Sequence, residues 1–575
     1  MTETYEADNI GSIPLVFGLL EHVGLSTHIN THYPIHKNWI GGDKGMIVTV
    51  WLCYILTVKD HRLYTVEGWF RQHNRSINLL LTSYGHAELS PKDFTDDRLG
   101  SLLSAFSVEE IWQTFMNSFS RNLLKLYDIS IRHVELDATV AQQYRSVIEG
   151  GLLQMGHSKQ HRSDLPQFKS MLSNAAEQNI PLLIQTVSGN RADDGLYLPI
   201  IIQTRSIIGT IGILWQGDSK LGSLDNRYAI SKHGDYYLTP ASLVQINAEA
   251  LRNYVTTYKT NNGQWTDIYI DKEIKGKNEQ VLIGSGFEVS VELSHKGFCW
   301  TERRLVVRSD AYATAQIAIF NKQLNQAFTQ LNDLTERKQG KRVPKSAEEL
   351  LKKAQSIVKK NNVAPFFTLD VLTKTTIKEI NAYKDTAART VETSTFDLEF
   401  EQNQELIEQH KLFLGYRIYM TNQTNDLMTI QGVIENYRKE YKIERRIRNL
   451  KEEVCALLPI YLQKDDRIIG LVNLLTLLLQ IVSIAEYRIA QSLKEEEQKE
   501  QQKMPGLYVG QPKLKTDKPS MSKILEALSA IILISIIIDG IVVKKVITNQ
   551  NDITNEIIKL IRLPINPYEV LLEST

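Results

Sequence analysis

The sequence feature that most constrains the fold is a set of short apolar runs between residues 131 and 242. The runs IRHVELDAT, PLLIQTVSGN, GILWQGD and YYLTPAS have the length of strands. Residues 195–208 and 222–233 repeat apolar side chains at helical spacing. This alternation predicts an α/β core. A similar run, KLFLGYRIYMTN, returns at 411–422, so we expect an insertion to interrupt the core.

The pattern predicts five segments along the chain. The first has apolar residues at helical spacing, and the insertion starts with polar, strand-prone sequence before long charged helices. A charge run, LKEEEQKEQQK, leads into the tail. The segments are a helical N-terminal domain (1–130), the first part of the core (131–242), the insertion (243–395), the second part of the core (396–500) and a helical C-terminal tail (501–575).

Charge and cysteine content narrow the possible functions. The 66 Lys and Arg residues balance 66 Asp and Glu residues, so binding to a polyanion must depend on local basic clusters. The three cysteines lie far apart, which argues against a disulfide framework or a zinc site. The N-terminus lacks a secretory pattern, so we expect a cytoplasmic protein. The apolar run 524–543 contains two carboxylates, and these argue against a membrane-spanning helix.

Two carboxylates follow predicted strands of the core. Asp137 closes the run HVEL, and Asp218 follows GILWQG. Ligands of open α/β sheets bind at the carboxyl ends of strands, so two such aspartates can share one metal ion. An Asp that closes a strand is more often a turn or cap residue. Strand position alone therefore leaves both interpretations open.

A third acidic residue lies on a predicted helix that begins near Asp426 and continues past Lys451. Tyr437, Glu444 and Lys451 are seven residues apart, which is about two helical turns, so we expect them to share one face. The alternative is a solvated helix that carries charge pairs, and this is the usual interpretation of an arbitrary charged helix.

In combination these motifs resemble the insertion-sequence transposases of the DDE class, whose third acidic residue lies in a Tyr-x2-Arg-x3-Glu-x6-Lys signature. Tyr437, Glu444 and Lys451 match that spacing, and VELDAT and WQGDSK stand where the first two family aspartates occur. The signature Arg position holds Glu440, which removes a cation that would hold DNA phosphate. Further matching stretches are GHSKQHRSDLPQFK (156–169), VSGNRADD (187–194) and MTN (420–422).

The resemblance implies a ribonuclease-H-like mixed sheet and a cut-and-paste transposase. Its catalytic and metal-binding residues would be Asp137, Asp218 and Glu444, which would hold two Mg²⁺ ions, with Mn²⁺ as a substitute. The implied partners are double-stranded DNA at the element ends and target and a second copy in a homodimer, with no membrane. The implied DNA contacts are Tyr437, Arg448, Lys451, Lys159, His161, Arg162 and Trp300.

Several of these assignments have alternatives. Residues 156–169 also fit a polar surface loop, and Trp300 fits a core tryptophan as well as a residue that stacks on a flipped base. The N-terminal domain and the tail both remain candidates to read the DNA end. Glu440 leaves two other functions open, namely a catalytically impaired DNA-binding relative or a Mg²⁺-dependent endonuclease.

Overall fold

The computed structural model describes residues 3–156, 162, 164–261, 263–274, 277–336, 344–380, 389–495, 503–508 and 514–573. By internal contacts the chain divides into two units. Unit 1 comprises Met1–Thr239, Leu293–Trp300 and Asn436–Thr575, and unit 2 comprises Pro240–Glu292 and Thr301–Glu435. The five-segment division made from the sequence stays a prediction.

Unit 1 contains five strands of a large mixed sheet, in the order β4-β3-β2-β5-β6. Pairs β4–β3 and β3–β2 are antiparallel, whereas β2–β5 and β5–β6 are parallel. Helices α7 (Tyr197–Ile208) and α8 (Leu224–Lys232) make the crossovers, so the predicted α/β core is confirmed. The strands are β2 (His133–Gln142), β3 (Gln167–Ala175), β4 (Ile180–Ser188), β5 (Leu214–Gly217) and β6 (Tyr236–Pro240).

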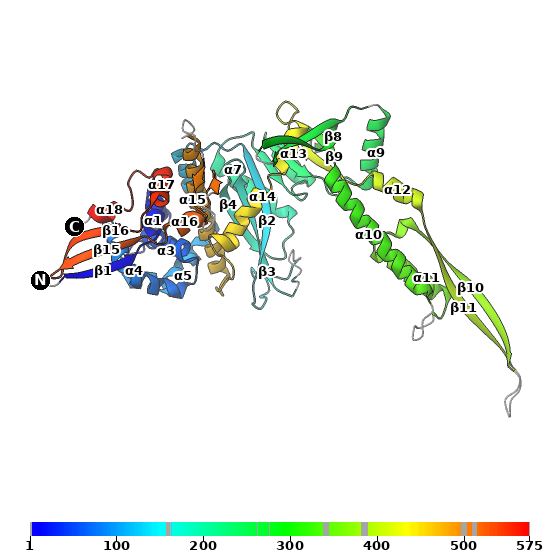
Figure 1. The fold of residues 1–575 in the computed structure, drawn as a ribbon, viewed down its shortest axis with the longest axis horizontal. Coiled ribbons are helices and arrows are strands. Elements are labelled where there is room, and N and C mark those ends of the chain that lie inside the picture. Colours follow the sequence, from blue (N-terminus) through cyan, green and yellow to red (C-terminus); the bar gives the residue numbers. More distant parts are fainter. Residues whose placement is uncertain are drawn as a thin grey trace, which may run out of the picture. The chain divides into compact units, whose positions relative to one another are not determined.

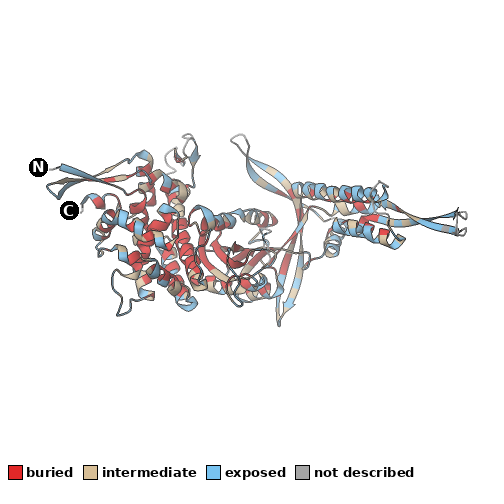
Figure 2. Cartoon of the chain, turned by 90° about the horizontal axis from the view of Figure 1, so that it is seen from below, coloured by how far each residue is buried: buried red, intermediate tan, exposed pale blue. Residues whose placement is uncertain are grey.

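The N-terminal part of unit 1 is helical, as the apolar spacing predicts. A long helix, α15 (Asp465–Glu495), packs against α5 and β4 and is largely buried, and Figure 2 draws buried residues in red. It is the one helix in the described ranges that is long and apolar enough to cross a membrane, but 94% of its most apolar window is buried inside the protein. The N-terminal elements are β1 (Glu3–Asn9), α1 (Ile13–His22), α2 (Leu25–His32), α3 (Lys44–Val58), α4 (Leu63–Ser83), α5 (Asp96–Phe106) and α6 (Glu109–Leu126).

The C-terminal tail is not purely helical, so that expectation was wrong. Its apolar run forms the end of α16 (Met521–Leu528) and a hairpin of β15 (Ile532–Ile538) and β16 (Ile541–Thr548), and β1 pairs with β15 (Figure 1). The run ILISIII is rich in β-branched residues, which favour strands. Asp539 and Gly540 join the strands with φ of 49° and 84°, as an Asp-Gly hairpin turn requires. The tail ends in α17 (Asp552–Ile561) and α18 (Val570–Glu573).

The signature region is not one continuous helix. Helix α13 (Ile430–Tyr437) ends at Tyr437, and α14 (Tyr441–Arg448) starts after a turn and leads into a π-helical turn (Asn449–Glu453). In the turn, the amide of Glu440 bonds the carbonyl of Tyr437, three residues back. The prediction that Tyr437 and Glu444 share one helical face was therefore wrong. Arg438, Lys439 and Glu440 are good helix formers, so packing and not propensity breaks the helix.

Unit 2 contains the strand-plus-helix insertion. Its helices α10 and α11 pack on the β10–β11 hairpin around a separate apolar core that includes Phe320, Leu350 and Leu398. Ser346 caps α11 by accepting the amide of Glu349 at 3.1 Å. The elements are α9 (Ala248–Thr260), β7 (Thr266–Ile274), β8 (Lys277–His295), β9 (Phe298–Ser309), α10 (Asp310–Thr335), α11 (Ala347–Lys360), β10 (Phe367–Ile380), β11 (Arg389–Gln402), α12 (Gln404–Leu412) and β12 (Tyr416–Thr421).

Candidate active site on the mixed sheet

The two aspartates lie side by side on neighbouring strands. Strand β2 continues past Asp137 to Gln142, so Asp137 is inside the strand and does not close it, contrary to the prediction. The parallel register pairs Leu136 with Gly217, the last residue of β5. The residue after Leu136 is Asp137, and the residue after Gly217 is Asp218. Neighbouring strands are about 4.8 Å apart. The sheet thus brings the two carboxylates together.

Four hydrogen bonds hold Asp218 in place, and one of them is donated by the Leu221 amide to the Asp218 carbonyl at 3.1 Å. The Tyr197 hydroxyl donates to Oδ1 at 2.7 Å, and the Lys220 amide donates to the same oxygen at 2.8 Å. The Thr239 hydroxyl donates to the Asp218 carbonyl at 2.7 Å, which ties the residue to β6. Both side-chain bonds fall on one carboxylate oxygen, so Oδ2 is the oxygen that stays available to a cation.

Tyr197 is a site residue that sequence reasoning missed. It lies on α7 and is 1% exposed. Burial, followed by the charges of Asp218 and Asp137, raises the pKa of its phenol well above the usual range. The hydroxyl therefore stays protonated at neutral pH and remains a donor. The matching stretch VSGNRADD just ahead of α7 was the available signal.

That stretch adds a third carboxylate near the phenol. The charge of Asp193 also raises the pKa of Tyr197. Lys169 on β3 donates to Asp193 Oδ1 at 2.6 Å and to the Arg191 carbonyl at 2.7 Å. Lys169 thus balances part of the negative charge that Asp137, Asp218 and Asp193 place around this end of the sheet.

Glu444 does not join the aspartates in this structure. Its side chain is exposed on α14, and no three His, Cys, Asp or Glu residues gather to hold a metal ion within the described ranges. Lys451 is anchored over β2, since its Nζ donates to the Val140 carbonyl at 2.6 Å. Arg448 pairs with Glu453 at 3.0 Å, on the surface. The register thus places two of the three predicted carboxylates beside each other, and no metal-binding group of three that includes Glu444 forms among the described residues.

A buried glutamate precedes Asp137 on the same face of β2. Glu135 is 2% exposed and accepts a bond of 3.3 Å from Asn174, while its Oε1 has no hydrogen-bond partner among the residues that the structure describes. Burial raises the pKa of Glu135 to about 8, and the charge of Glu440 adds to that increase. Burial also lowers the pKa of His133, two residues earlier, to about 4. The residue in the signature Arg position is thus close enough to a buried carboxyl group for its charge to raise the pKa of that group.

The other predicted DNA contacts are mostly engaged or peripheral. Trp300 is 8% exposed, and its Nε1 donates to the Tyr237 hydroxyl at 3.1 Å, which fits the core interpretation. Arg162 makes two bonds of 2.8 Å to Asp164 and is otherwise exposed. Lys159 and His161 lie outside the described residues.

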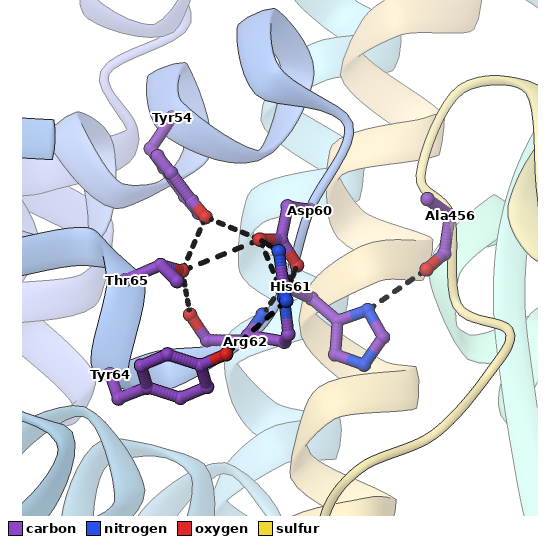
Figure 3. A network of polar contacts seen from close by, with 7 residues as sticks. All are labelled: Tyr54, Asp60, His61, Arg62, Tyr64, Thr65 and Ala456. Atoms are coloured by element: carbon purple, nitrogen blue, oxygen red, sulfur yellow. Dashed lines mark hydrogen bonds and ion pairs between the residues drawn. The ribbon is translucent and has the colours of Figure 1, made fainter.

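A polar network beside α4 anchors the chain just after the signature region (Figure 3). Asp60 accepts bonds from Tyr54 and Arg62, and although burial raises its pKa, the bonds from Arg62 bring that pKa down to about 2. The neighbouring His61 is 2% exposed, and its Nδ1 lies 2.8 Å from the carbonyl of Ala456. Ala456 has a positive φ of 47°, so this contact fixes a sharp turn. The network is structural and supports the segment behind α14.

No family model matches the chain, and no curated protein matches it. One similar solved structure is described as a cryo-EM structure of the piggyBac transposase synaptic complex with hairpin DNA. The match has 11% identity and a TM-score of 0.25, and it covers 53% of this chain and 60% of that chain. A TM-score this low supports no conclusion about fold or activity.

Proposed function

We propose that the protein is a DDE-type DNA transposase with a ribonuclease-H-like core. The observation that carries the proposal is the pairing of Leu136 in β2 with Gly217 at the end of parallel strand β5, which places the next residues, Asp137 and Asp218, beside each other. Three antiparallel strands followed by two parallel ones support the ribonuclease-H-like sheet that the sequence resemblance implies. The signature spacing around Glu444 supplies the third carboxylate.

The carboxylates fit a site for hard divalent cations. Asp137 and Asp218 offer adjacent oxygen ligands, which Mg²⁺ and Mn²⁺ prefer, and Asp218 is held by Tyr197 and Lys220 so that one oxygen stays available. Two bound Mg²⁺ ions would supply activation of a water or 3′-hydroxyl and stabilisation of the departing oxygen. The residues of the chain position these ligands and exclude other orientations of Asp218.

Glu444 reaches the aspartates, in this proposal, when a DNA end binds. Helix α14 is bounded by a turn at residues 438–440 and by the π-helical turn Asn449–Glu453, so its position is set by packing more than by a continuous helical backbone. Catalytic geometry that tightens only in the substrate complex is common in enzymes. The phosphates of the end would attract the exposed arginines of α14, which already packs against β2, and bring its exposed face with Glu444 closer to the aspartates.

The test is cleavage of DNA that bears the terminal inverted repeats flanking the coding sequence. We expect Mg²⁺-dependent nicking at the repeat ends that is lost in Asp137→Ala, Asp218→Ala and Glu444→Ala. The control is Asp97→Ala, which removes an exposed carboxylate on α5 and should leave nicking unchanged. Nicking that survives both aspartate substitutions would contradict the proposal, because the metal ligands would then lie elsewhere.

A second candidate function is a DNA-binding relative that has lost strand transfer. Glu440 favours this candidate, because it stands in the signature Arg position and its negative charge raises the pKa of buried Glu135. Site-specific binding without cleavage in the same assay would support this candidate. Cleavage that ignores the repeat ends would instead support a Mg²⁺-dependent endonuclease.

A further inference from the structure

A pocket of about 230 Å³ lies in unit 1 beside α14. Its walls come from α14, the turn between β3 and β4, helix α15 and the segment just before α16. Lys442 and Arg446 of α14 reach into this side, whereas Glu444 lies about 200° around the helix from each of them. The pocket is therefore separate from the aspartates described above.

One ion pair in the pocket is complete. Arg446 is 4% exposed, and its Nη1 lies 2.7 Å from Glu486 Oε2 while its Nε donates to the Asn179 carbonyl at 2.8 Å. The other oxygen of Glu486 accepts the amide of Met521 at 2.7 Å, so the start of α16 is already satisfied. Because the charges of Arg446 and Glu486 cancel, this pair does not itself attract a charged ligand.

Four more cations line the pocket or its rim, against one remaining carboxylate, Glu177. In the part of the chain that the structure describes, Arg445, Lys494 and Lys518 have no carboxylate within ion-pair distance, and all three are exposed. Lys442 is partly buried and donates to the Ala176 carbonyl at 3.0 Å. The pocket thus has a net positive charge that the described part of the protein does not balance.

The cations also crowd one another. Burial lowers the pKa of the Lys442 amine, the charges of Glu135 and Glu177 raise it, and the charges of Lys439 and Lys518 lower it. A bound anion would relieve this repulsion, and it would be held by the planar guanidinium of Arg445 together with flexible lysine amines. A concave site with several donors suits a tetrahedral, multiply accepting group better than a single carboxylate.

We propose that this pocket binds a backbone phosphate of DNA. The proposal rests on the proposed function for its choice of DNA, since a free polyphosphate has the same chemistry. Because Lys442 and Arg445 belong to the helix that carries Glu444, a phosphate held here contacts that helix on a face about 100–200° around it from Glu444. The pocket thereby extends the DNA-binding surface to a face that the signature residues do not cover.

The test compares two double variants that remove the same charge. The pocket variant, Lys494→Gln with Lys518→Gln, removes two lysines from the rim of the pocket. Neither lysine has an ion-pair partner among the described residues. The control, Lys523→Gln with Lys559→Gln, removes two lysines that lie 2.7 Å and 3.9 Å from the carboxylates of their own helices. Binding of a fluorescein-labelled 25-base-pair duplex is measured by anisotropy between 50 and 200 mM KCl, with EDTA and no divalent metal.

Each phosphate contact contributes about 0.9 to the slope of log K against log salt, so loss of both contacts should reduce the slope by about 1.8. At 0.1 M KCl this corresponds to binding that is weaker by about eightfold for one contact and about sixtyfold for two. The control variant should retain the wild-type slope. Equal slopes and affinities in the pocket and control variants would overturn the proposal.

Two further arms separate the alternatives. If tripolyphosphate raises the melting temperature of the wild type but not of the pocket variant, while duplex binding is the same in both, the ligand is a free polyphosphate and the DNA proposal fails. Should the wild type cut nothing while the pocket variant still loses duplex binding, the proposed chemistry fails and the pocket stands.

Discussion

Glu135 gives the sharpest quantitative prediction. Its carboxyl group is 2% exposed, and burial raises its pKa to about 8 from an ordinary value of 4.5. Between these values the folded protein holds a proton that the unfolded chain has lost. Stability is therefore greatest at low pH and is lost as pH rises through the folded pKa, at about 1.4 kcal/mol per unit.

His133 acts in the opposite direction at lower pH. Burial lowers its pKa to about 4 from 6.5, so the unfolded chain holds the extra proton between these values and stability rises with pH. Below pH 6.5 the contributions of His133 and Glu135 largely cancel. From pH 6.5 to 9 the contribution of Glu135 remains uncompensated by His133, and it amounts to a loss of about 2 kcal/mol.

The assay is urea unfolding of wild type and Glu135→Gln at half-unit intervals from pH 5.5 to 9. Six of the seven tryptophans lie in unit 1, so tryptophan fluorescence reports mainly on the unit that contains Glu135. The neutral glutamine should remove this loss. Because both proteins contain His133, their stability difference reports Glu135 alone and should change by about 3 kcal/mol between pH 5.5 and 9, of which about 2 kcal/mol falls above pH 6.5. Glu110→Gln, which changes an exposed carboxylate on α6, should follow the wild type.

A stability difference between wild type and Glu135→Gln that stays constant from pH 6.5 to 9 would refute this reasoning. It would mean that Glu135 is ionised in the folded protein over the whole range. The charges of Lys442 and Lys439, which lower its pKa, would then outweigh its burial.

Three other substitutions test the structure elsewhere. Tyr197→Phe should weaken Mn²⁺ binding, measured by electron paramagnetic resonance, by about tenfold, because Asp218 loses a hydrogen bond of 2.7 Å; Tyr568→Phe, an equally buried control, should not. Gly540→Ala should lower the melting temperature, because an alanine at a φ of 84° costs about 1–2 kcal/mol of folding free energy. Gly68→Ala, at an exposed position of helix α4, should raise it. Trp300→Ala should cost about 3–5 kcal/mol in urea unfolding, and an unchanged midpoint would contradict its core position.

The α/β core was predictable because its signals are local. Short apolar runs and helical spacing predicted strands β2, β4, β5 and β6 and helices α7 and α8 close to their observed bounds. The pairing of β2 with β5 was not predictable in the same way, since register depends on contacts between distant residues. The adjacency of Asp137 and Asp218 follows from that register, so the sequence could indicate both carboxylates but not their geometry.

The features that the sequence did not predict each have a particular cause. The tail contains Asp539-Gly540 within a β-branched run, and this hairpin signal was outweighed by the length of the apolar stretch. The break before α14 has no local signal, because Arg438, Lys439 and Glu440 all favour helix. The hydrogen bond from Tyr197 to Asp218 joins residues 21 positions apart on different elements, and no spacing rule reaches it.

The two halves of the candidate site differ in what their assembly costs. Asp218 is held by Tyr197 and Lys220, so the sheet half needs no rearrangement. Any movement of α14 that brings Glu444 closer must either keep the buried pair of Arg446 and Glu486 or lose about 3–5 kcal/mol. A shift confined to the first turn of α14, which begins beside the break at residues 438–440, keeps that pair. Closure by this turn alone is therefore the movement that DNA binding can drive at least cost.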